Sequence, residues 1–215
     1  RKGPSTGFKE DMAFSQGEQA LALGRNEDGS WLLVKPLNLQ VKCWVSASLA
    51  DMPFDWKTLE VRQSPAFTLA SISGVVWNDK CEFFGGVAGE PVVLGDGCVD
   101  LGDVQAGEFG ANAERDSGEP GFSDVRIQLG SGECSSTGLA ETTTAKDGSY
   151  RFSGLEPGTY CVTLDVMYDG NPNRLIPGGL TYPSRGAGVG RWTIKLYYGD
   201  AKSGIDFGWE FQHLG

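Results

Sequence analysis

The chain has 215 residues, a net charge of −10 and a single histidine, His213. This length fits one or two domains, and 40% hydrophobic residues are enough for ordinary cores. The acidic balance argues against nucleic acid as a partner, because phosphate binding requires clustered Lys and Arg. With one histidine near the end of the chain, no Ser-His-Asp or Cys-His arrangement is evident, and we expect no enzyme. This segment contains no apolar run of about 18 residues, so we expect no membrane insertion in it.

Glycine and cysteine usage point to an all-β protein outside the cytoplasm. The 32 glycines and 10 prolines are spread along the chain, which is typical of many short strands joined by tight turns. The five cysteines form no CxxC motif, so disulfides are favoured over zinc, and disulfides persist in oxidising compartments. We therefore expect a secreted or cell-surface protein. No signal peptide is visible in this segment, and we expect further sequence upstream of Arg1.

Residues 1–52 predict a first small domain. A turn cluster at Asn26–Ser30 separates the apolar runs Ala20–Leu23 and Trp31–Val34, which predicts a hairpin. The motifs RKGPSTGF at the start, LGRNEDGSW around the turn and WVSASL at Trp44–Leu49 resemble bacterial SH3-like domains. The resemblance implies a small barrel. Trp31 and Trp44 then become candidates for a face that binds cell-wall peptide or glycan, with a place in the core as the alternative.

Residues 53–69 are the expected connection, punctuated by Pro53 and Pro65, and Leu59–Val61 is a candidate for a short strand. An ordered connection packed on the barrel and a flexible one both remain open.

Residues 70–215 form the second expected domain. Short strand patterns separated by Gly and Pro turns predict a β-sandwich. The expected strands are Ile72–Trp77, Val125–Leu129, Glu141–Thr144, Ser149–Phe152, Tyr160–Leu164, Thr193–Tyr198 and Ile205–Phe211, with Asp165–Arg191 expected as a surface loop.

The segment Glu141–Leu164 has the clearest strand pattern in the chain. Turn signals at Lys146-Asp147-Gly148 and Glu156-Pro157-Gly158 separate three runs rich in β-branched and aromatic residues. We expect three antiparallel strands of one sheet. The sequence DGSYRFSGLEPGTYCVTL in this segment resembles the prealbumin-like Cna-B-type domains, in particular the B repeats of serine-aspartate-repeat adhesins. SGVVWND near the first strand, and DSGEPG followed by VRIQL, extend the resemblance over about Ile72–Gln212.

A long acidic, Gly-rich insertion, residues 80–115, follows the first strand of this domain and contains two cysteines. We expect the disulfide Cys81–Cys98 to staple it. Cys134 and Cys161 fall in regions that can face each other in a sandwich, so we expect them to pair and Cys43 to remain free. Reduced buried thiols are the alternative.

The resemblance also implies a calcium site. In the resembling repeats an acidic loop between the first two strands binds Ca²⁺, and this chain retains matching positions at Asp79, Asn112, Asp116 and Glu119. Ala113 stands where the repeats usually have Gly, and the insertion divides the pattern. The alternative is a metal-free loop held by the Cys81–Cys98 bridge. We therefore expect that the protein requires no cofactor, and Ca²⁺ is the candidate ion for the loop.

The resemblance implies a non-catalytic structural or adhesion role, as a stalk, spacer or fibre subunit at a cell surface. Self-assembly of copies into a fibre is one version of this role. The alternatives are a module that binds cell-wall peptide or surface glycan through the SH3-like barrel, and an accessory region of a larger secreted enzyme.

Overall fold

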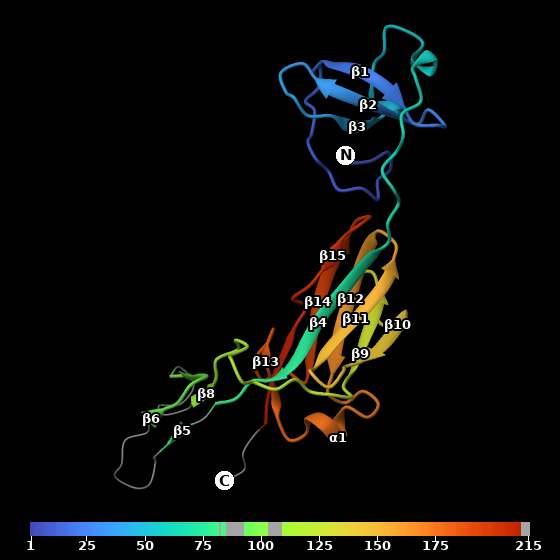
Figure 1. Cartoon of the computed structure of the whole chain (residues 1–215). Helices are drawn as coiled ribbons and strands as arrows, with labels where there is room; N and C mark the ends of the chain where they lie inside the picture. The colour runs from blue at the N-terminus through green and yellow to red at the C-terminus, as the bar shows by residue number, and fades with distance from the viewer. Residues whose placement is uncertain (82, 85–92, 103–108, 212–215) are drawn as a thin grey trace. The chain divides into compact units, whose positions relative to one another are not determined.

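The computed structural model describes residues 1–81, 83–84, 93–102 and 109–211. His213 and parts of the expected insertion, residues 82, 85–92 and 103–108, lie outside the described residues. The described chain is almost entirely strands and turns (Figure 1). It divides into two compact units. The first is Arg1–Ala70 with Leu155–Pro157 and Tyr197–Asp200, and the second is Ser71–Gly154, Gly158–Leu196 and Ala201–Gly215.

The first unit contains a three-stranded antiparallel sheet of β1 (Ala20–Arg25), β2 (Trp31–Pro36) and β3 (Cys43–Ser46). The hairpin predicted around Asn26–Ser30 is present, because β1 pairs with β2 on either side of that turn. Side chains within the turn replace missing backbone partners: Asn26 Oδ1 accepts from the Trp31 amide at 2.8 Å, and Asp28 Oδ1 accepts from the Ser30 amide at 2.8 Å. Such Asx contacts favour turns and fix the direction of the strands that follow.

A small core holds the first sheet together. Leu32, Val34 and Cys43 are buried with Ala47, which begins the short 3-10 helix η1 (Ala47–Leu49). Side chains from the expected connection pack against this core: Leu59, and Trp56 of the 3-10 helix η2 (Trp56–Thr58). The Arg62 amide also donates to the Arg25 carbonyl at 2.8 Å, and Val61 forms an isolated parallel bridge with Arg25. These contacts give the first half of the connection an ordered path over the sheet.

The second unit is a β-sandwich of two sheets, as predicted (Figure 1). One sheet has the order β10 (Ala140–Thr143), β9 (Arg126–Ser131), β12 (Gly158–Asp165), β14 (Val189–Leu196). The other has the order β11 (Ser149–Leu155), β4 (Ala70–Asn78), β16 (Phe207–Glu210), β13 (Gly179–Tyr182), and β15 (Ala201–Lys202) also pairs with β4. Strands β15 and β16 run parallel to β4, whereas the remaining registered pairs are antiparallel.

The sandwich core follows from period-two alternation along these strands. Apolar side chains with an exposed fraction of 2% or less include Val76 and Trp77 on β4, Val162 and Leu164 on β12, and Trp209 on β16. Strand β12 is buried on both faces, since Cys161 and Thr163 are also covered although they point away from Val162 and Leu164. A second layer must therefore cover the outer face of this sheet at Cys161.

One topological prediction was wrong. Strands β10 and β12 share a sheet, but β11 lies between them in sequence and belongs to the opposite sheet, so the three strands are not one antiparallel meander. The predicted turn at Lys146–Gly148 exists, with the Gly148 amide donating to the Ala145 carbonyl at 2.9 Å. The Gly148 carbonyl then accepts from the Val76 amide at 2.9 Å, which joins the chain to β4. Because Gly148 has φ of +78° and touches the Val76 carbonyl, only a residue without Cβ allows this crossing.

The segment Asp165–Arg191 is also more regular than predicted. It contains a one-turn helix, α1 (Pro172–Leu175), the strand β13 and the start of β14. Asn171, which is fully buried, anchors the segment: its Oδ1 accepts from the Arg126 amide at 2.7 Å and its Nδ2 donates to the carbonyls of Arg126 and Asp165. These bonds replace ladder partners at the end of β9, so the excursion is fixed to the sandwich.

The described residues of the expected insertion form four short strands. Strand β5 (Phe83–Phe84) pairs with β6 (Val93–Leu94), and β7 (Cys98–Asp100) pairs with β8 (Phe109–Ala111). In the second pair Cys98 lies opposite Ala111. The β7–β8 pairing therefore brings the acidic loop that follows Ala111 close to the Cys81–Cys98 disulfide. This pairing positions the candidate site described below.

Candidate functional site

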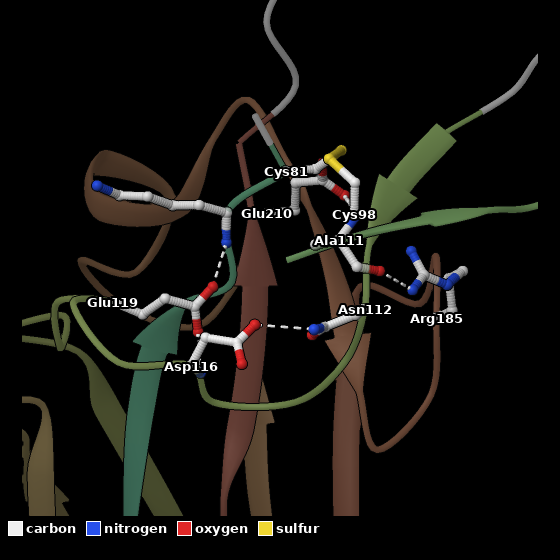
Figure 2. Close-up of a disulfide and its surroundings, with 9 residues drawn as sticks. Cys81, Cys98, Ala111, Asn112, Asp116, Glu119, Arg185 and Glu210 are labelled. Carbon is white, nitrogen blue, oxygen red and sulfur yellow. Dashed lines mark hydrogen bonds between the residues drawn. A yellow bond between two sulfur atoms is a disulfide. The ribbon is translucent and has the colours of Figure 1, made fainter. Parts of the chain in front are cut away.

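The acidic loop after β8 lies beside the end of β4. The disulfide Cys81–Cys98 joins the residue that follows Lys80 to the start of β7, with a Cα–Cα distance of 4.6 Å. Since Cys98 pairs with Ala111 across the β7–β8 ladder, the bridge holds Ala111 and the neighbouring Asn112 close to the end of β4 (Figure 2). The Ala113 amide donates to Asp79 Oδ2 at 3.0 Å and confirms this proximity. The chain can make this contact because Ala113 adopts φ of +65°, the left-handed conformation that usually favours Gly.

Hydrogen bonds link three of the four residues predicted to bind calcium, Asn112, Asp116 and Glu119, within the acidic loop. Asn112 Nδ2 donates to Asp116 Oδ2 at 2.8 Å, and the Asp116 amide donates to Glu119 Oε2 at 2.9 Å (Figure 2). The other Glu119 oxygen, Oε1, accepts from the Lys80 amide at 2.7 Å. The loop is therefore closed on itself by its own acidic and amide side chains.

Asp79 differs from the other three because it is fully buried. Burial raises the pKa of its carboxyl to about 6, the charges of Glu119 and Glu210 add to this rise, and the Thr181 hydroxyl and the Ala113 amide oppose it. Asp79 Oδ1 has no hydrogen bond of ordinary geometry, although the Thr181 hydroxyl is close enough to lower the pKa. The Thr181 hydroxyl also lacks such a partner, so the end of β4 carries an unsatisfied polar pair.

The fit of these residues to calcium is partial. Their donors are oxygens, the ligands that Ca²⁺ prefers, and Asp79 Oδ1 is a buried acceptor without a donor. Within the described parts of the chain, however, no three Asp, Glu, His or Cys side chains are gathered closely enough to hold a metal ion. Both Glu119 oxygens and one Asp116 oxygen accept hydrogen bonds from the loop itself. Calcium binding would require Glu119 or Asp116 to exchange these bonds for the ion.

Two further residues belong to this region and were missed by sequence reasoning. Glu210, after Trp209 on β16, accepts from the Ala111 amide at 3.2 Å, and the Arg185 guanidinium donates to the Ala111 carbonyl (Figure 2). Glu210 is 99 residues and Arg185 is 74 residues from Ala111 along the chain, and neither belongs to a recognisable motif. Only the sandwich topology brings them to the loop, because β16, which carries Glu210, pairs with β4, and β13, which precedes Arg185, pairs with β16.

The second disulfide, Cys134–Cys161, connects the loop after β9 to the centre of β12, with a Cα–Cα distance of 4.9 Å. Its loop supplies the layer that covers Cys161 on the outer face of the sheet, and the Cys134 amide donates to Thr193 Oγ1 at 3.3 Å. Among the described cysteines only Cys43 is unpaired. It is buried in the core of the first unit, and burial raises the pKa of its thiol.

The first unit has a cavity of about 600 Å³ beside the β1–β2 turn. Trp31 lines it, whereas Trp44 is only 4% exposed and belongs to the core. Of the two tryptophans considered as a ligand face, the structure thus leaves Trp31 available and favours the core alternative for Trp44. The lining residues are Pro4, Ser5, Thr6, Asn26, Glu27, Asp28, Ser30, Trp31, Ser64 and Phe67.

Comparison with known proteins finds a family model that is similar to part of the second unit. Residues 99–174 match the model of the SdrD B-like domain family. This segment is similar to a structural, adhesin-type module. The SdrD B-like segment runs from β7 to α1 and includes Asn112, Asp116 and Glu119, but it begins after Asp79.

A curated protein is also similar to part of this chain. The chain is 32% identical to Colossin-A of Dictyostelium discoideum over 79 residues, which is 37% of this chain and 1% of Colossin-A. The chain thus spans about one hundredth of the length of this relative. In the described residues no helix is long and apolar enough to cross a membrane. The adhesin-type match and the two disulfides fit an extracellular or cell-surface protein.

Proposed function

We propose that this chain is a non-catalytic structural part of a secreted or cell-surface protein, acting as a stalk, spacer or fibre subunit. The observation that carries the proposal is the SdrD B-like segment set in a sandwich with two disulfides. A spacer has to stay folded outside the cell, where chaperones are absent. Bridges that close loops of 17 and 27 residues limit the unfolded chain and serve this need.

Sedimentation and electron microscopy test how the spacer acts. If the chain is a fibre subunit, the purified protein should assemble with rising concentration into filaments, with protein as its partner. A protein that remains monomeric at all concentrations and carries no activity on candidate substrates fits a stalk. Turnover of a substrate that is lost on mutating a single side chain would contradict the structural proposal and favour an accessory region of a secreted enzyme.

We further propose that the acidic loop takes up Ca²⁺ through Asp79, Asn112, Asp116 and Glu119. The buried Asp79 Oδ1 without a donor supports the proposal, and a bound cation would offset the charges that Glu119 and Glu210 place near it. Bound calcium would tie the end of β4 to the loop after β8 in addition to the Cys81–Cys98 bridge. The metal-free loop, already closed by its own hydrogen bonds, is the competing state.

Chelation tests the calcium proposal. A ligand present at about a hundred times its Kd stabilises the folded state by about 2.7 kcal/mol, so removing Ca²⁺ should lower the Tm by several degrees. The variant Glu119→Gln should reduce this shift. Glu114→Gln removes a carboxylate from an exposed residue of the same loop and should retain it. An unchanged Tm on chelation, with no metal in elemental analysis, would mean that the bridge and hydrogen bonds alone hold the loop.

The pKa of Asp79 gives a separate prediction for chelated protein. Because the folded-state pKa of about 6 lies above the ordinary value of 3.8, this carboxyl favours folding below about pH 4, and the benefit is lost as the pH rises through 6. Relative to Asp79→Asn, the native chain should therefore lose about 2 kcal/mol of unfolding free energy between pH 4 and pH 7. Urea unfolding of both proteins across this range measures the difference. A difference that is independent of pH would contradict the assigned environment of Asp79.

A second candidate function is binding of cell-wall peptide or surface glycan by the first unit, which we propose is an SH3-like barrel. The cavity beside Trp31 favours this candidate. The two functions are compatible, since a spacer can carry a binding module at one end. Pull-down on cell walls, compared between the native chain and Trp31→Ala, tests it. Retention that survives Trp31→Ala would remove the cavity from consideration.

A further inference from the structure

We infer that the cavity of the first unit binds a positively charged amino group carried by a peptide, such as a lysine side chain or a free amino terminus. This inference rests on the proposed binding function of the first unit and assigns its ligand class. Three separate segments build the cavity: the N-terminal segment Pro4–Thr6, the β1–β2 turn Asn26–Trp31, and Ser64 with Phe67 after η2. The volume of about 600 Å³ lies in the range of small-ligand sites.

The charged groups of the lining are all acidic. Glu27 and Asp28 are exposed residues on the turn, and among the described residues that line the cavity there is no Lys, Arg or His. Asp28 stays ionised, because hydrogen bonds from the Ser30 hydroxyl and amide lower the pKa of its carboxyl. Only one Asp28 oxygen, Oδ1, makes these bonds, at 2.6 and 2.8 Å. The lining therefore repels anions such as phosphate and attracts a cation.

In the described part of the chain, the neighbouring arginines form no ion pair with either of these two carboxylates. Arg25 directs its guanidinium to the backbone carbonyls of Asn26, Glu27 and Lys57. Arg1 forms an ion pair with Glu10 at 2.9 Å and also donates to backbone carbonyls. Neither arginine lines the cavity. Glu27 and Asp28 are therefore the charged residues of the lining, and both are exposed to solvent.

Aromatic and hydroxyl groups complete the recognition chemistry. The rings of Trp31 and Phe67 lie in the same lining, and aromatic faces attract ammonium groups. The hydroxyls of Ser5, Thr6 and Ser64 add hydrogen-bonding groups that suit a peptide backbone. Asn26 is held by the turn, with Nδ2 donating to Ser30 Oγ at 3.2 Å and Oδ1 accepting from the Trp31 amide, so the turn side of the cavity is pre-formed.

Titration of the full chain with Nα-acetyl-lysine methylamide, followed by NMR of the Trp31 indole, tests the inference. We expect saturable binding that weakens as the salt rises from about 0.05 to about 0.5 M. The same probe acetylated at its side-chain amine should not bind. Glu27→Gln and Asp28→Asn should each weaken binding by up to about five-fold, the upper range for an exposed ion pair.

The control variant is Asp51→Asn, which removes one negative charge from an exposed residue of the same unit outside the cavity and should leave binding unchanged. Equal binding of the acetylated and the charged probe would overturn the inference. So would binding of a neutral cell-wall oligosaccharide at Trp31 that Glu27→Gln does not weaken, although the first unit would then still be a binding module. Loss of binding to cell walls in Trp31→Ala without any response to the amine probe would likewise refute the amine site alone.

Discussion

Replacing Trp209 with alanine should lower the unfolding free energy of the second unit by about 4 kcal/mol, since removal of a large buried aromatic side chain costs about 3 to 5 kcal/mol. Trp209 is 1% exposed at the centre of β16, between β4 and β13. Its indole Nε1 donates to the Leu175 carbonyl at 2.8 Å, which fixes α1 to the sheet. The substitution therefore leaves a cavity and a buried carbonyl without its donor.

The variant Trp209→Phe separates these two contributions. It retains most of the volume and loses the donor, so the expected loss is about 1 to 3 kcal/mol, the cost of an unsatisfied buried polar group. Urea unfolding followed by circular dichroism gives both values. If Trp209→Ala lost less than about 1 kcal/mol, Trp209 would not lie in the core that the structure assigns to it.

Removal of the Cys134–Cys161 bridge should have the second largest effect. Serine at both positions is expected to lower the unfolding free energy by about 3 to 4 kcal/mol, because the bridge closes a loop of 27 residues in the unfolded chain. The substitution also places a hydroxyl at Cys161, which is completely buried on the outer face of β12. The bridge thus stabilises the second unit and holds the loop that covers the sheet.

Cys43→Ser provides a control for thiol chemistry, because Cys43 is unpaired and belongs to the first unit. The unfolding transition of the second unit should be the same in this variant as in the native chain. Reduction of the native chain should approach the transition of the Cys134→Ser, Cys161→Ser variant. A native chain whose stability is unaffected by reductant would show that neither bridge forms in solution.

Local structure could be predicted from the sequence where neighbouring residues determine it. The turn at Asn26–Ser30 closes through its own side chains, and the period-two alternation at Tyr160–Leu164 correctly indicated a strand. The sheet to which each strand belongs could not be predicted in the same way. The turn at Gly148 has the sequence of a hairpin, yet it carries the chain to β4 because its carbonyl pairs with Val76, 72 residues earlier.

In the candidate site, too, local features could be predicted from the sequence, whereas features that depend on long-range packing could not. Asp79, Asn112, Asp116 and Glu119 follow a motif and lie in one hydrogen-bonded loop. The buried state of Asp79 depends on the topology that surrounds β4, which no local pattern encodes. Asn171 is a further example, since its three bonds to Arg126 and Asp165 ordered a segment whose prolines indicated a surface loop. Long-range contacts of this kind are set by tertiary packing rather than by sequence propensity.

We propose that this chain is part of an extracellular structural protein and that two disulfides hold its second unit. Peptide mass spectrometry of protein from its native source tests it most directly, with a membrane-impermeant amine label applied before lysis and thiol alkylation applied after unfolding without reductant. We predict labelled surface lysines, intact Cys81–Cys98 and Cys134–Cys161 peptides, and alkylation confined to Cys43. Unlabelled lysines together with alkylation of all five cysteines would contradict the claim.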